Sequence, residues 1–393
     1  MSKKHVLIVA NSLAQGGAER VISILLERYH DDSDFEVELV LLEDKISYAL
    51  PEGVKVKVLS STKSDASGLK KILAIPFLAF KLYRYVKETN ADLVVSFIYR
   101  ADYVNVLASL FHKKPAIVSE RVNASSTYAN NSINAKINKT LIKFFYAKAS
   151  KVINVSEGTK QDLVENFAID AKKQIVIYNP YDIAKIKKLS GESIDFDVQK
   201  EKTMVAVSRF RPIKNIQMML GAFATLKDDT KLILVGDGSE ESALLELANE
   251  LGIQERVLFV GGQDNPYKFM SKASLYISSS RSEGFPNAMV EAMICGCVIL
   301  STDCPSGPRE ILAPTSDITK RMREGIEYAE FGALVAVDDI EAMGSALERL
   351  LSDDVMRKSY LKKSKERVND FQLENIYSQY SDAFTTVIRE AKS

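Results

Sequence analysis

The sequence predicts an α/β protein with two doubly wound domains, each a parallel sheet covered by helices. Short apolar segments alternate with helical segments along the whole chain, which is the pattern of parallel strands joined by crossover helices. The chain has 393 residues, more than one hydrophobic core usually serves. Residues 180–202 are rich in Lys, Asp, Ser and Glu with little periodicity, which is typical of a linker. We therefore expect domains at 1–182 and 200–370 that face each other across a cleft.

Each domain is expected to contain a series of short, buried strands. In the first domain we expect strands at 5–10, 36–42, 55–59, 93–97, 116–119, 152–155 and 174–177. In the second we expect them at 204–207, 231–235, 256–260, 275–277 and 298–301. Helical patterns cover 18–29, 70–88 and roughly 353–391. The last of these carries Phe371, Tyr377, Tyr380 and Phe384 at near-helical spacing, so a helix at about 371–391 can pack back on the first domain.

Composition and charge exclude some classes of function. The chain is 46% hydrophobic and 26% charged, which is ordinary for a soluble globular protein. Its 52 basic and 52 acidic residues balance, so it lacks the basic signature of a nucleic-acid-binding protein. The charge is uneven, however: residues 1–181 carry 25 Lys and Arg against 19 Asp and Glu. This excess predicts that the first half meets an anionic partner.

The cysteines and the N-terminus favour a cytoplasmic protein without a metal site. Cys295 and Cys297 lie in an apolar segment, and Cys304 follows closely. With no histidine nearby we interpret them as buried hydrophobic residues rather than zinc ligands. The first residues lead straight into a strand without the apolar region of a signal peptide, and no apolar run is long enough to span a bilayer.

Two glutamates eight positions apart are the most informative feature. Glu283 and Glu291 belong to the segment 282–293, which reads SEGFPNAMVEAM and follows an apolar strand. Pro286 suits the start of a helix, so Glu283 is expected at the strand's C-terminal end and Glu291 about two turns into the helix. Ligands of open α/β sheets bind at this edge, and the helix N-terminus favours an anion. A nucleotide-sugar combines the required hydroxyls and phosphate.

Three loops could contribute to the same site. Arg209 comes just after the first strand of the second domain and Lys214 near the start of the next helix, which suits two cations gripping a diphosphate. Taken alone, they could equally be solvated surface cations. Gly236, in a Gly-Asp-Gly loop, and the adjacent Gly16 and Gly17 before a helix allow close backbone approach to a ligand, although each could also be a plain turn.

In their order and spacing these features resemble the retaining glycosyltransferases of family 4, which have the GT-B fold. The resemblance covers essentially the whole chain. It rests on the loop 16–19, Arg209 with Lys214, the loop 236–238 and the segment from Glu283 to 296. More narrowly, residues 118–121, 178–180 and 301–310 look like bacterial enzymes that assemble lipid-linked oligosaccharides and surface polysaccharides. Among these are the α-1,4-N-acetylgalactosaminyltransferases of N-glycan pathways.

The resemblance implies a role for each donor-site residue. Arg209 and Lys214 would hold the diphosphate and stabilise the leaving group, and Glu283 would accept from hydroxyls of the donor sugar. Glu291 would accept from the ribose. Further donor contacts would come from the backbone near Phe285, Pro286 and Asn287 and from the loops of Gly16, Gly17 and Gly236. No catalytic metal and no cofactor are implied, because side-chain cations and a helix dipole replace them. In the alternative, a glycosidase mechanism, the two glutamates would act as general acid and nucleophile.

The acceptor side is expected to be lipid-linked. Relatives often carry His one residue after the position of Glu120, but here Arg121 stands there and could bind phosphate or acceptor. Lys136, Lys139 and Lys143 share a helix face; in the relatives, cations of such a helix engage the pyrophosphate of an undecaprenyl-linked acceptor. The basic, aromatic segments 70–87 and 134–151 predict peripheral attachment to the inner face of the plasma membrane, or else ordinary amphipathic helices.

The sequence thus predicts a retaining transferase that moves a hexose or N-acetylhexosamine from a UDP-sugar to a polyprenyl-diphosphate-linked glycan. Two other classes stay open. One is a UDP-sugar epimerase or a phosphorylase on the same frame, which labelled donor with and without acceptor would separate. The other is a non-catalytic sugar-binding protein, against which the joint presence of Arg209, Lys214, Glu283 and Glu291 speaks.

Overall fold

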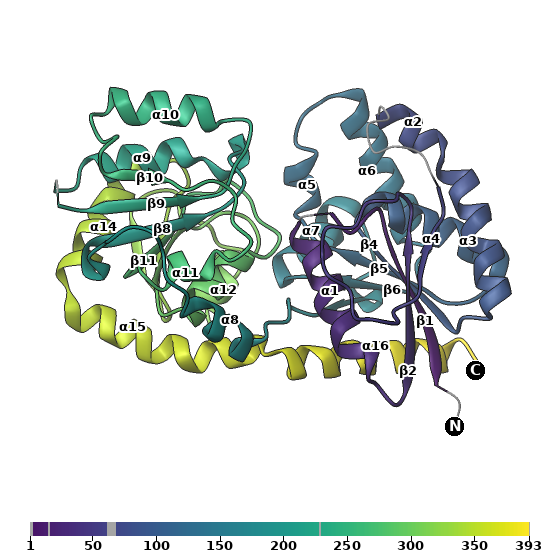
Figure 1. The fold of residues 1–393 in the computed structure, drawn as a ribbon. Helices are drawn as coiled ribbons and strands as arrows, with labels where there is room; N and C mark the ends of the chain where they lie inside the picture. The colour runs from purple at the N-terminus through teal and green to yellow at the C-terminus, as the bar shows by residue number, and fades with distance from the viewer. Residues whose placement is uncertain (1–2, 15, 61–67, 228, 393) are drawn as a thin grey trace. The chain divides into compact units, whose positions relative to one another are not determined.

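The structure, a computed structural model, describes residues 3–14, 16–60, 68–227 and 229–392. Contacts divide the chain into two compact units. Unit 1 consists of Met1–Pro180 and Glu374–Ser393, and unit 2 of Tyr181–Leu373. Each unit is a seven-stranded sheet with helices on both faces (Figure 1). The predicted class, two doubly wound α/β domains, is therefore confirmed.

The sheet of unit 1 is parallel throughout, in the order β3-β2-β1-β4-β5-β6-β7. Its strands are runs of buried aliphatic residues, as expected where helices cover both faces. The strand order reverses between β1 and β4, which makes their C-terminal ends the switch point where such sheets bind ligands. The strands are β1 (Lys4–Ala10), β2 (Phe35–Leu41), β3 (Val56–Val58), β4 (Leu93–Phe97), β5 (Ala116–Glu120), β6 (Lys151–Asn154) and β7 (Gln174–Val176).

Two helical layers bury the faces of this sheet. One core contains apolar residues of α3, α4, α6 and α7, and the other contains those of α1 and the C-terminal helix α16, which runs along unit 1 in Figure 1. The helices are α1 (Gly17–His30), α2 (Gly68–Leu73), α3 (Ile75–Thr89), α4 (Tyr99–His112), α5 (Ala124–Thr127), α6 (Ile133–Tyr146), α7 (Glu157–Phe167), the 3₁₀ helix η1 (Ala171–Lys173) and α16 (Leu373–Glu390).

The sheet of unit 2 has the order β10-β9-β8-β11-β12-β14-β13, with β13 antiparallel to β14. The order reverses between β8 and β11, so this sheet also has a switch point at the C-terminal ends of its central strands. The strands are β8 (Thr203–Val207), β9 (Lys231–Val235), β10 (Val257–Phe259), β11 (Leu275–Ser278), β12 (Val298–Thr302), β13 (Ile326–Tyr328) and β14 (Ala333–Val335).

Helices again cover both faces of the second sheet. The core of one face contains apolar residues of α9, α10 and α14, while α8, α11 and α12 contact one another on the other. The helices are α8 (Ile183–Ser190), η2 (Lys200–Lys202), η3 (Pro212–Lys214), α9 (Ile216–Ala224), α10 (Glu241–Glu250), α11 (Tyr267–Met270), α12 (Asn287–Ile294), α13 (Pro308–Leu312), α14 (Ile340–Ser352), α15 (Asp354–Arg367) and η4 (Val368–Phe371).

Three segments differ from expectation. The expected linker 180–202 contains α8, which the side chain of Asp182 caps by accepting from Lys185 N–H at 2.9 Å. The helix is short, and Ile186 is its one buried residue. The helical pattern at 70–88 is two helices, because Pro76 lacks an N–H and is tolerated only in the first turn of α3. The strands β13 and β14, three residues each, were not anticipated.

Within the described ranges, no helix combines the length and hydropathy that crossing a bilayer requires.

Candidate active site

The loop after β8 carries the two predicted cations at the switch point of unit 2. Arg209 lies two residues beyond the strand, and its Nη1 is 2.7 Å from Oδ1 of Asp237. Both side chains are about half exposed, at 46% and 49%. The backbone N–H of Phe210 donates to the Asp237 carbonyl at 2.7 Å, so the loops after β8 and β9 are tied together beside this ion pair.

Gly236 makes that loop pairing possible. Its φ is +144°, and a Cβ built on it would lie 1.8 Å from the carbonyl oxygen of Ser208. A Cβ at Gly238 would lie 2.3 Å from the carbonyl oxygen of Phe210. Only glycine fits at either position. The structure thus gives Gly236 a clear role in packing the two loops, beside the donor contact predicted for it.

Lys214 and Glu283 form the centre of the candidate site. The Lys214 Nζ is 2.6 Å from Glu283 Oε1, and the Ser280 hydroxyl donates to the same oxygen at 2.6 Å. The lysine and glutamate side chains are only 24% and 12% exposed. The Ser279 hydroxyl also donates to the Lys214 carbonyl at 2.9 Å. The ends of β8 and β11, which flank the switch point, therefore present one hydrogen-bonded group of opposite charges.

The helix α12 follows directly after Glu283. Its N-cap is Pro286, whose side chain has no hydrogen-bonding group, so the first-turn N–H groups are not capped by their own N-cap side chain. Glu291 is 2% exposed and lies one turn into the helix, not the expected two, because α12 begins at Asn287 and not earlier.

The residues before α12 are packed from two sides. Phe285 and Pro286 are buried. The ring of Phe371 meets Phe285 edge-on at 5.5 Å between centroids. A Cβ on Gly307, whose φ is +93°, would lie 2.5 Å from Cδ of Pro286. The loop after β12 thus presses against the start of α12, and the N–H of Glu283 donates to the Pro305 carbonyl of that loop at 3.1 Å.

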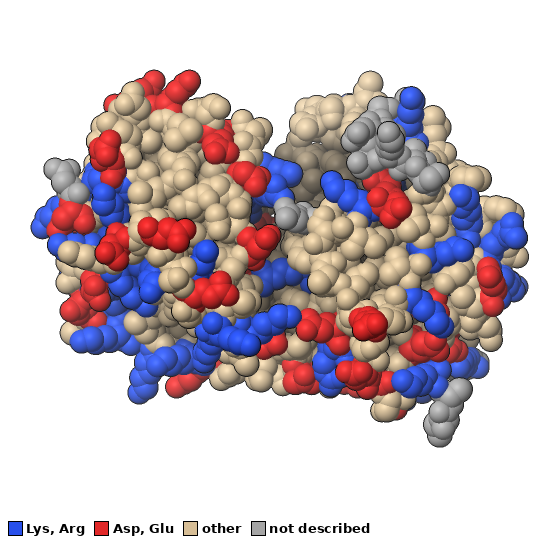
Figure 2. Space-filling model, viewed as in Figure 1, with Lys and Arg blue, Asp and Glu red and all other residues tan. Residues whose placement is uncertain are grey.

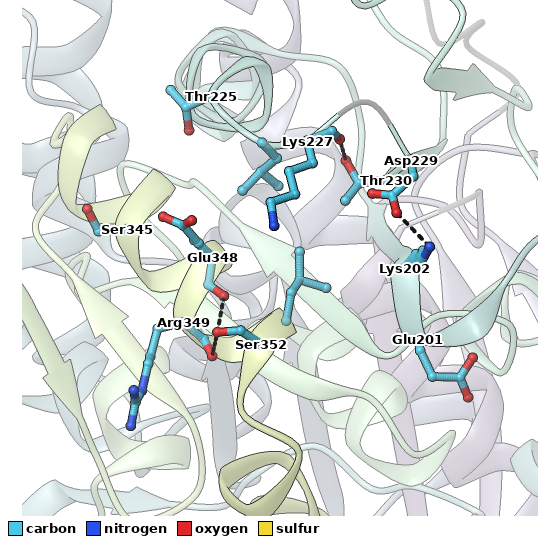
Figure 3. A pocket seen from close by; sticks show the side chains of 12 residues that line it. Glu201, Lys202, Thr225, Lys227, Asp229, Thr230, Ser345, Glu348, Arg349 and Ser352 are labelled. Atoms are coloured by element: carbon cyan, nitrogen blue, oxygen red, sulfur yellow. Dashed lines mark hydrogen bonds and ion pairs between the residues drawn. The ribbon is translucent and has the colours of Figure 1, made fainter.

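A hollow of about 470 Å³ lies elsewhere in unit 2. Its lining includes Glu201 and Lys202 before β8, Asp229 and Thr230 before β9, and the end of α14 (Figure 3). These positions are at the N-terminal edge of the sheet, away from the switch-point loops. Lys202 and Asp229 are already paired at 2.5 Å, and acids and bases alternate around the wall, so nothing there converges on a diphosphate.

In unit 1, the loop after β1 places Gly16 at the N-cap of α1 and Gly17 as the first helical residue. Glycine offers no side-chain cap. The Tyr48 hydroxyl donates to the Gly16 carbonyl at 3.0 Å. A Cβ at Gly16 would lie 2.3 Å from Oε2 of Glu19, so this carboxylate packs against the loop. Burial raises the pKa of Glu19.

Glu120 is the last residue of β5 and is 2% exposed. Its Oε1 accepts from the backbone N–H groups of Arg121 at 2.9 Å and Val122 at 3.1 Å. Burial raises the pKa of Glu120 to about 8, and the nearby Asp102 carboxyl adds to the rise. The carboxyl therefore shapes the turn after β5 from within, and contact with an acceptor stays a prediction.

Arg121 is held by its own unit. The guanidinium donates to the side-chain oxygen of Asn179 and to the Tyr380 hydroxyl at 3.4 Å, and it lies 5.7 Å from the centroid of Phe97. These contacts join the end of β5 to α16 and to Asn179, near the end of the first segment of unit 1. They give the cation a structural function in addition to the acceptor contact expected of it.

The three lysines predicted on one helix face lie on α6. Lys136 and Lys143 are exposed and Lys139 is partly exposed. The Ser132 hydroxyl caps α6 by accepting from Ala135 N–H at 3.1 Å, which fixes where the lysine face begins.

Two polar groups near the ends of the central strands of unit 1 were missed by sequence reasoning. Asp102, fully buried on α4, accepts from the Tyr146 hydroxyl at 2.9 Å, and burial raises its pKa to about 7. Its only sequence signal is a lone acid in an otherwise apolar segment. Arg100, just after β4 at the other switch point, pairs with Glu43 and donates to Asn11. No motif marks it.

The described residues also contain one group of metal-capable side chains. Donor atoms of His5, Glu36 and Glu38 lie within 4.8 Å of one another. The Lys55 ammonium contacts Glu36 at 2.8 Å and Glu38 at 3.2 Å. A side-chain cation thus already balances these carboxylates.

Comparison with known families identifies the chain. Residues 15–185 match the family described as Glycosyltransferase Family 4, and residues 193–367 match Glycosyl transferases group 1. The first match spans β2 to β7 of unit 1, and the second spans the whole sheet of unit 2. The chain belongs to this family of glycosyltransferases, and its architecture is the GT-B fold.

Individual relatives agree with this assignment. The chain is 36% identical over 361 residues, 92% of its length and 93% of the relative's, to the Campylobacter jejuni protein named N-acetylgalactosamine-N,N'-diacetylbacillosaminyl-diphospho-undecaprenol 4-alpha-N-acetylgalactosaminyltransferase. Among solved structures, sucrose-phosphate synthase from Thermosynechococcus elongatus superposes with a TM-score of 0.82 at 18% identity, covering 99% of this chain and 100% of that one. HepE from Anabaena, solved in complex with UDP, gives 0.74 at 20% identity, covering 97% and 99%.

Proposed function

We propose that this glycosyltransferase moves a hexose or N-acetylhexosamine from a UDP-sugar to a polyprenyl-diphosphate-linked glycan, with retention of the anomeric configuration. The observation that carries the proposal is the contact of Lys214 with Glu283 at the switch point of unit 2, just before α12 and with Lys214 in the segment after β8 that also carries Arg209. A cation and a carboxylate held at one point suit a ligand that presents phosphate and hydroxyl groups together.

When the donor binds, it replaces the carboxylates that now pair with the two cations. The diphosphate takes the place of Glu283 at the Lys214 ammonium and of Asp237 at the Arg209 guanidinium. Glu283, released from the lysine, accepts hydrogen bonds from hydroxyls of the sugar. Both cations then face the oxygen on which negative charge develops as the glycosidic bond to phosphate breaks, which stabilises the transition state.

No protein carboxylate acts as nucleophile in this proposal. The acceptor hydroxyl attacks on the face that the diphosphate leaves, and a phosphate oxygen takes its proton. Glu283 accepts from Lys214 and Ser280, so it is placed to bind and orient, and Glu291 is buried within α12, where it accepts from the ribose.

Two relatives support the choice of substrates. HepE was solved with UDP, which supports a uridine nucleotide as the donor carrier. The Campylobacter relative is named for a diphospho-undecaprenol substrate, which supports a lipid-linked diphosphate as the acceptor. On the acceptor side, the lysines 136, 139 and 143 of α6 offer cations for that diphosphate, and Arg121 and Glu120 shape the turn after β5.

A lipid-linked acceptor requires access to a membrane, and unit 1 carries a suitable surface. Phe77 and Phe80 of α3 and Phe111 of α4 are 58%, 57% and 66% exposed. The ring of Tyr83 lies 6.2 Å from Phe80 and 6.3 Å from Phe111, so these aromatics share one area. Lysines and arginines cover the surface where Figure 1 places α3 (Figure 2). Exposed aromatics among cations favour an anionic bilayer surface, here the inner face of the plasma membrane.

The test has a binding arm and a transfer arm. Thermal shifts with UDP-Gal, UDP-GlcNAc, UDP-GalNAc and GDP-mannose identify the donor, because a ligand that binds only the folded state raises its melting temperature. The labelled donor is then incubated with and without a polyprenyl-diphosphate glycan, and the anomeric coupling of the product is read by NMR. Acceptor-dependent transfer with an α product from an α donor is expected. Turnover without acceptor, or an inverted product, contradicts the proposal.

A further inference from the structure

The segments by which the chain passes between the two units pair with each other inside unit 2. The N–H of Tyr181 donates to the Phe371 carbonyl at 3.0 Å, and the N–H of Leu373 donates to the Tyr181 carbonyl at 3.0 Å. They form a parallel bridge between Tyr181 and Gln372. Tyr181 is the first residue of unit 2 on one crossing, and Leu373 is the last on the other.

The side chain of Tyr181 reaches the start of α12. Its hydroxyl donates to Oδ1 of Asn287 at 2.7 Å, and the residue is 2% exposed. A buried hydroxyl is costly unless it is hydrogen-bonded, so this bond selects the orientation of Asn287. Because a carboxamide is planar, fixing its oxygen also fixes where its NH₂ group points.

Phe371 supports the same loop by packing. Its ring meets Phe285 edge-on at 5.5 Å and lies 6.5 Å from the ring of Tyr181. Arg367 lies 4.8 Å from the Phe371 centroid and donates to the Glu310 carbonyl at 2.6 Å. The donor loop 284–287 is therefore supported from behind by one hydrogen bond and one aromatic contact, both from the crossing segments.

We propose that Tyr181 is a positioning residue of the donor site. Through its hydroxyl it holds Asn287, and with Phe371 it keeps loop 284–287 in the orientation that places Glu283 and the first-turn N–H groups of α12 around the donor. This rests on the proposed function, since it takes the loop to be the donor site. Pairing the two crossing segments needs only the backbone bonds of Tyr181, whereas its hydroxyl is directed at the start of α12.

The test compares Tyr181→Phe, which deletes only the hydroxyl, with Tyr360→Phe, a control tyrosine in the core of unit 2 that is 5% exposed. Binding of UDP is measured by titration calorimetry, and hydrogen exchange is followed in peptides covering 284–294. We expect UDP affinity to fall about three- to tenfold in Tyr181→Phe, the size of one lost hydrogen bond. We also expect faster exchange at the start of α12, with neither change in Tyr360→Phe.

Kinetics separate positioning from a general loss of structure. In Tyr181→Phe the KM for the donor identified above rises by the same factor, while the KM for the acceptor and the melting temperature stay near wild type. Tyr181 is not a positioning residue if UDP affinity and the KM for the donor are unchanged in Tyr181→Phe. The same conclusion follows if the KM values for donor and acceptor stay at wild-type level while only the stability and the active fraction of the protein fall. If the wild-type protein itself binds no UDP, the proposed function fails and this role fails with it.

Discussion

The two sheets end in loops of the same topology but of opposite electrostatic character. In unit 2, the loops after β8 and β11 hold charged pairs that are partly open to solvent, Lys214 with Glu283 and Arg209 with Asp237. In unit 1, the acids nearest the ends of β4 and β5 are Asp102 and Glu120, both buried, and burial raises the pKa of each. The loops of unit 2 present charged pairs, whereas these two acids of unit 1 are withdrawn from water, although Arg100 and Glu43 also form an ion pair at the edge of unit 1.

The difference shows how one fold is divided between two tasks. The Arg209–Asp237 pair is about half exposed, and exposed ion pairs are weak, so an incoming diphosphate can replace Asp237 without a large loss of stability. A buried carboxyl can instead fix a turn, as Glu120 does by accepting from the N–H groups of residues 121 and 122. Under the proposed function, unit 2 binds the charged donor and unit 1 presents a shaped loop to the acceptor.

The largest effect is expected at Glu283. Glu283→Gln keeps the shape and the contact with Ser280 but removes the charge that Lys214 and the sugar hydroxyls require. We expect kcat/KM for transfer to fall about a hundredfold to a thousandfold, the range found when one preorganised electrostatic contact is lost. Radiolabel transfer at matched protein concentrations measures it. Glu341→Gln, an exposed glutamate in the first turn of α14, is the control. Near wild-type transfer in Glu283→Gln would remove the residue from the site.

Removing Lys214 is expected to cost more than removing Arg209. The lysine side chain is 24% exposed and the arginine 46%, and a charge with less water around it interacts more strongly. We expect about a hundredfold loss of kcat/KM for Lys214→Ala and about tenfold for Arg209→Ala, as for a weaker charged hydrogen bond. Steady-state kinetics with varied donor give both values. Equal losses, or the reverse order, contradict this reading of the two cations.

Local spacing placed each segment of the candidate site of unit 2 at a strand end: Glu283, Pro286 and Glu291 lie within nine positions, and Lys214 follows Arg209 by five. The contact between the two segments, Lys214 with Glu283, joins positions 69 apart, and only the family resemblance predicted it. The partners that hold them come from elsewhere in the chain: Asp237 from the next loop, and Tyr181 from a crossing segment. Such long-range contacts leave no periodic signal.

The sequence did not predict which side chains are buried. Glu120 looks like a surface carboxylate at a strand end, yet it is 2% exposed, and Asp102 of α4 and Asp162 of α7 lie close enough to affect its pKa. Phe371 shows the same limit. Its spacing joins it to Tyr377, Tyr380 and Phe384, but it packs in unit 2 on Phe285, whereas the other three belong to the core of unit 1. Tertiary packing, not spacing, decides which core receives a side chain.

The two units are also expected to differ at their surfaces, because the exposed aromatic side chains of unit 1 are expected to bind lipid. The double variant Phe77→Ser with Phe111→Ser removes two exposed rings. We expect about tenfold weaker binding to vesicles of phosphatidylcholine with one third phosphatidylglycerol, because each ring contributes apolar area to the interface. Vesicle sedimentation measures it. Val355→Ser, which removes a 79% exposed apolar side chain from α15 of unit 2, is the control. Equal losses in both proteins, or no binding by the wild type, contradict the assignment of this surface.

The smallest effect concerns the buried acid at the end of β5, and it depends on pH. In the unfolded chain Glu120 loses its proton near its usual pKa of 4.5, whereas in the folded protein it keeps the proton until about pH 8. The free energy of unfolding therefore falls as pH rises between these values and levels off above them. Asp102 and Asp162, the acids that face Glu120, act in the same direction by repelling its charge.

Glu120→Gln removes this dependence, since a carboxamide is neutral at every pH and its oxygen can still accept from residues 121 and 122. We expect the variant to melt several degrees above wild type at pH 8.5 and to match it closely at pH 5. Melting curves across this range, with Glu157→Gln of α7, a partly exposed glutamate, as control, measure the difference. A variant that is less stable than wild type at high pH would show that Glu120 is ionised in the folded protein, and the contrast between the two sheet edges would then be wrong.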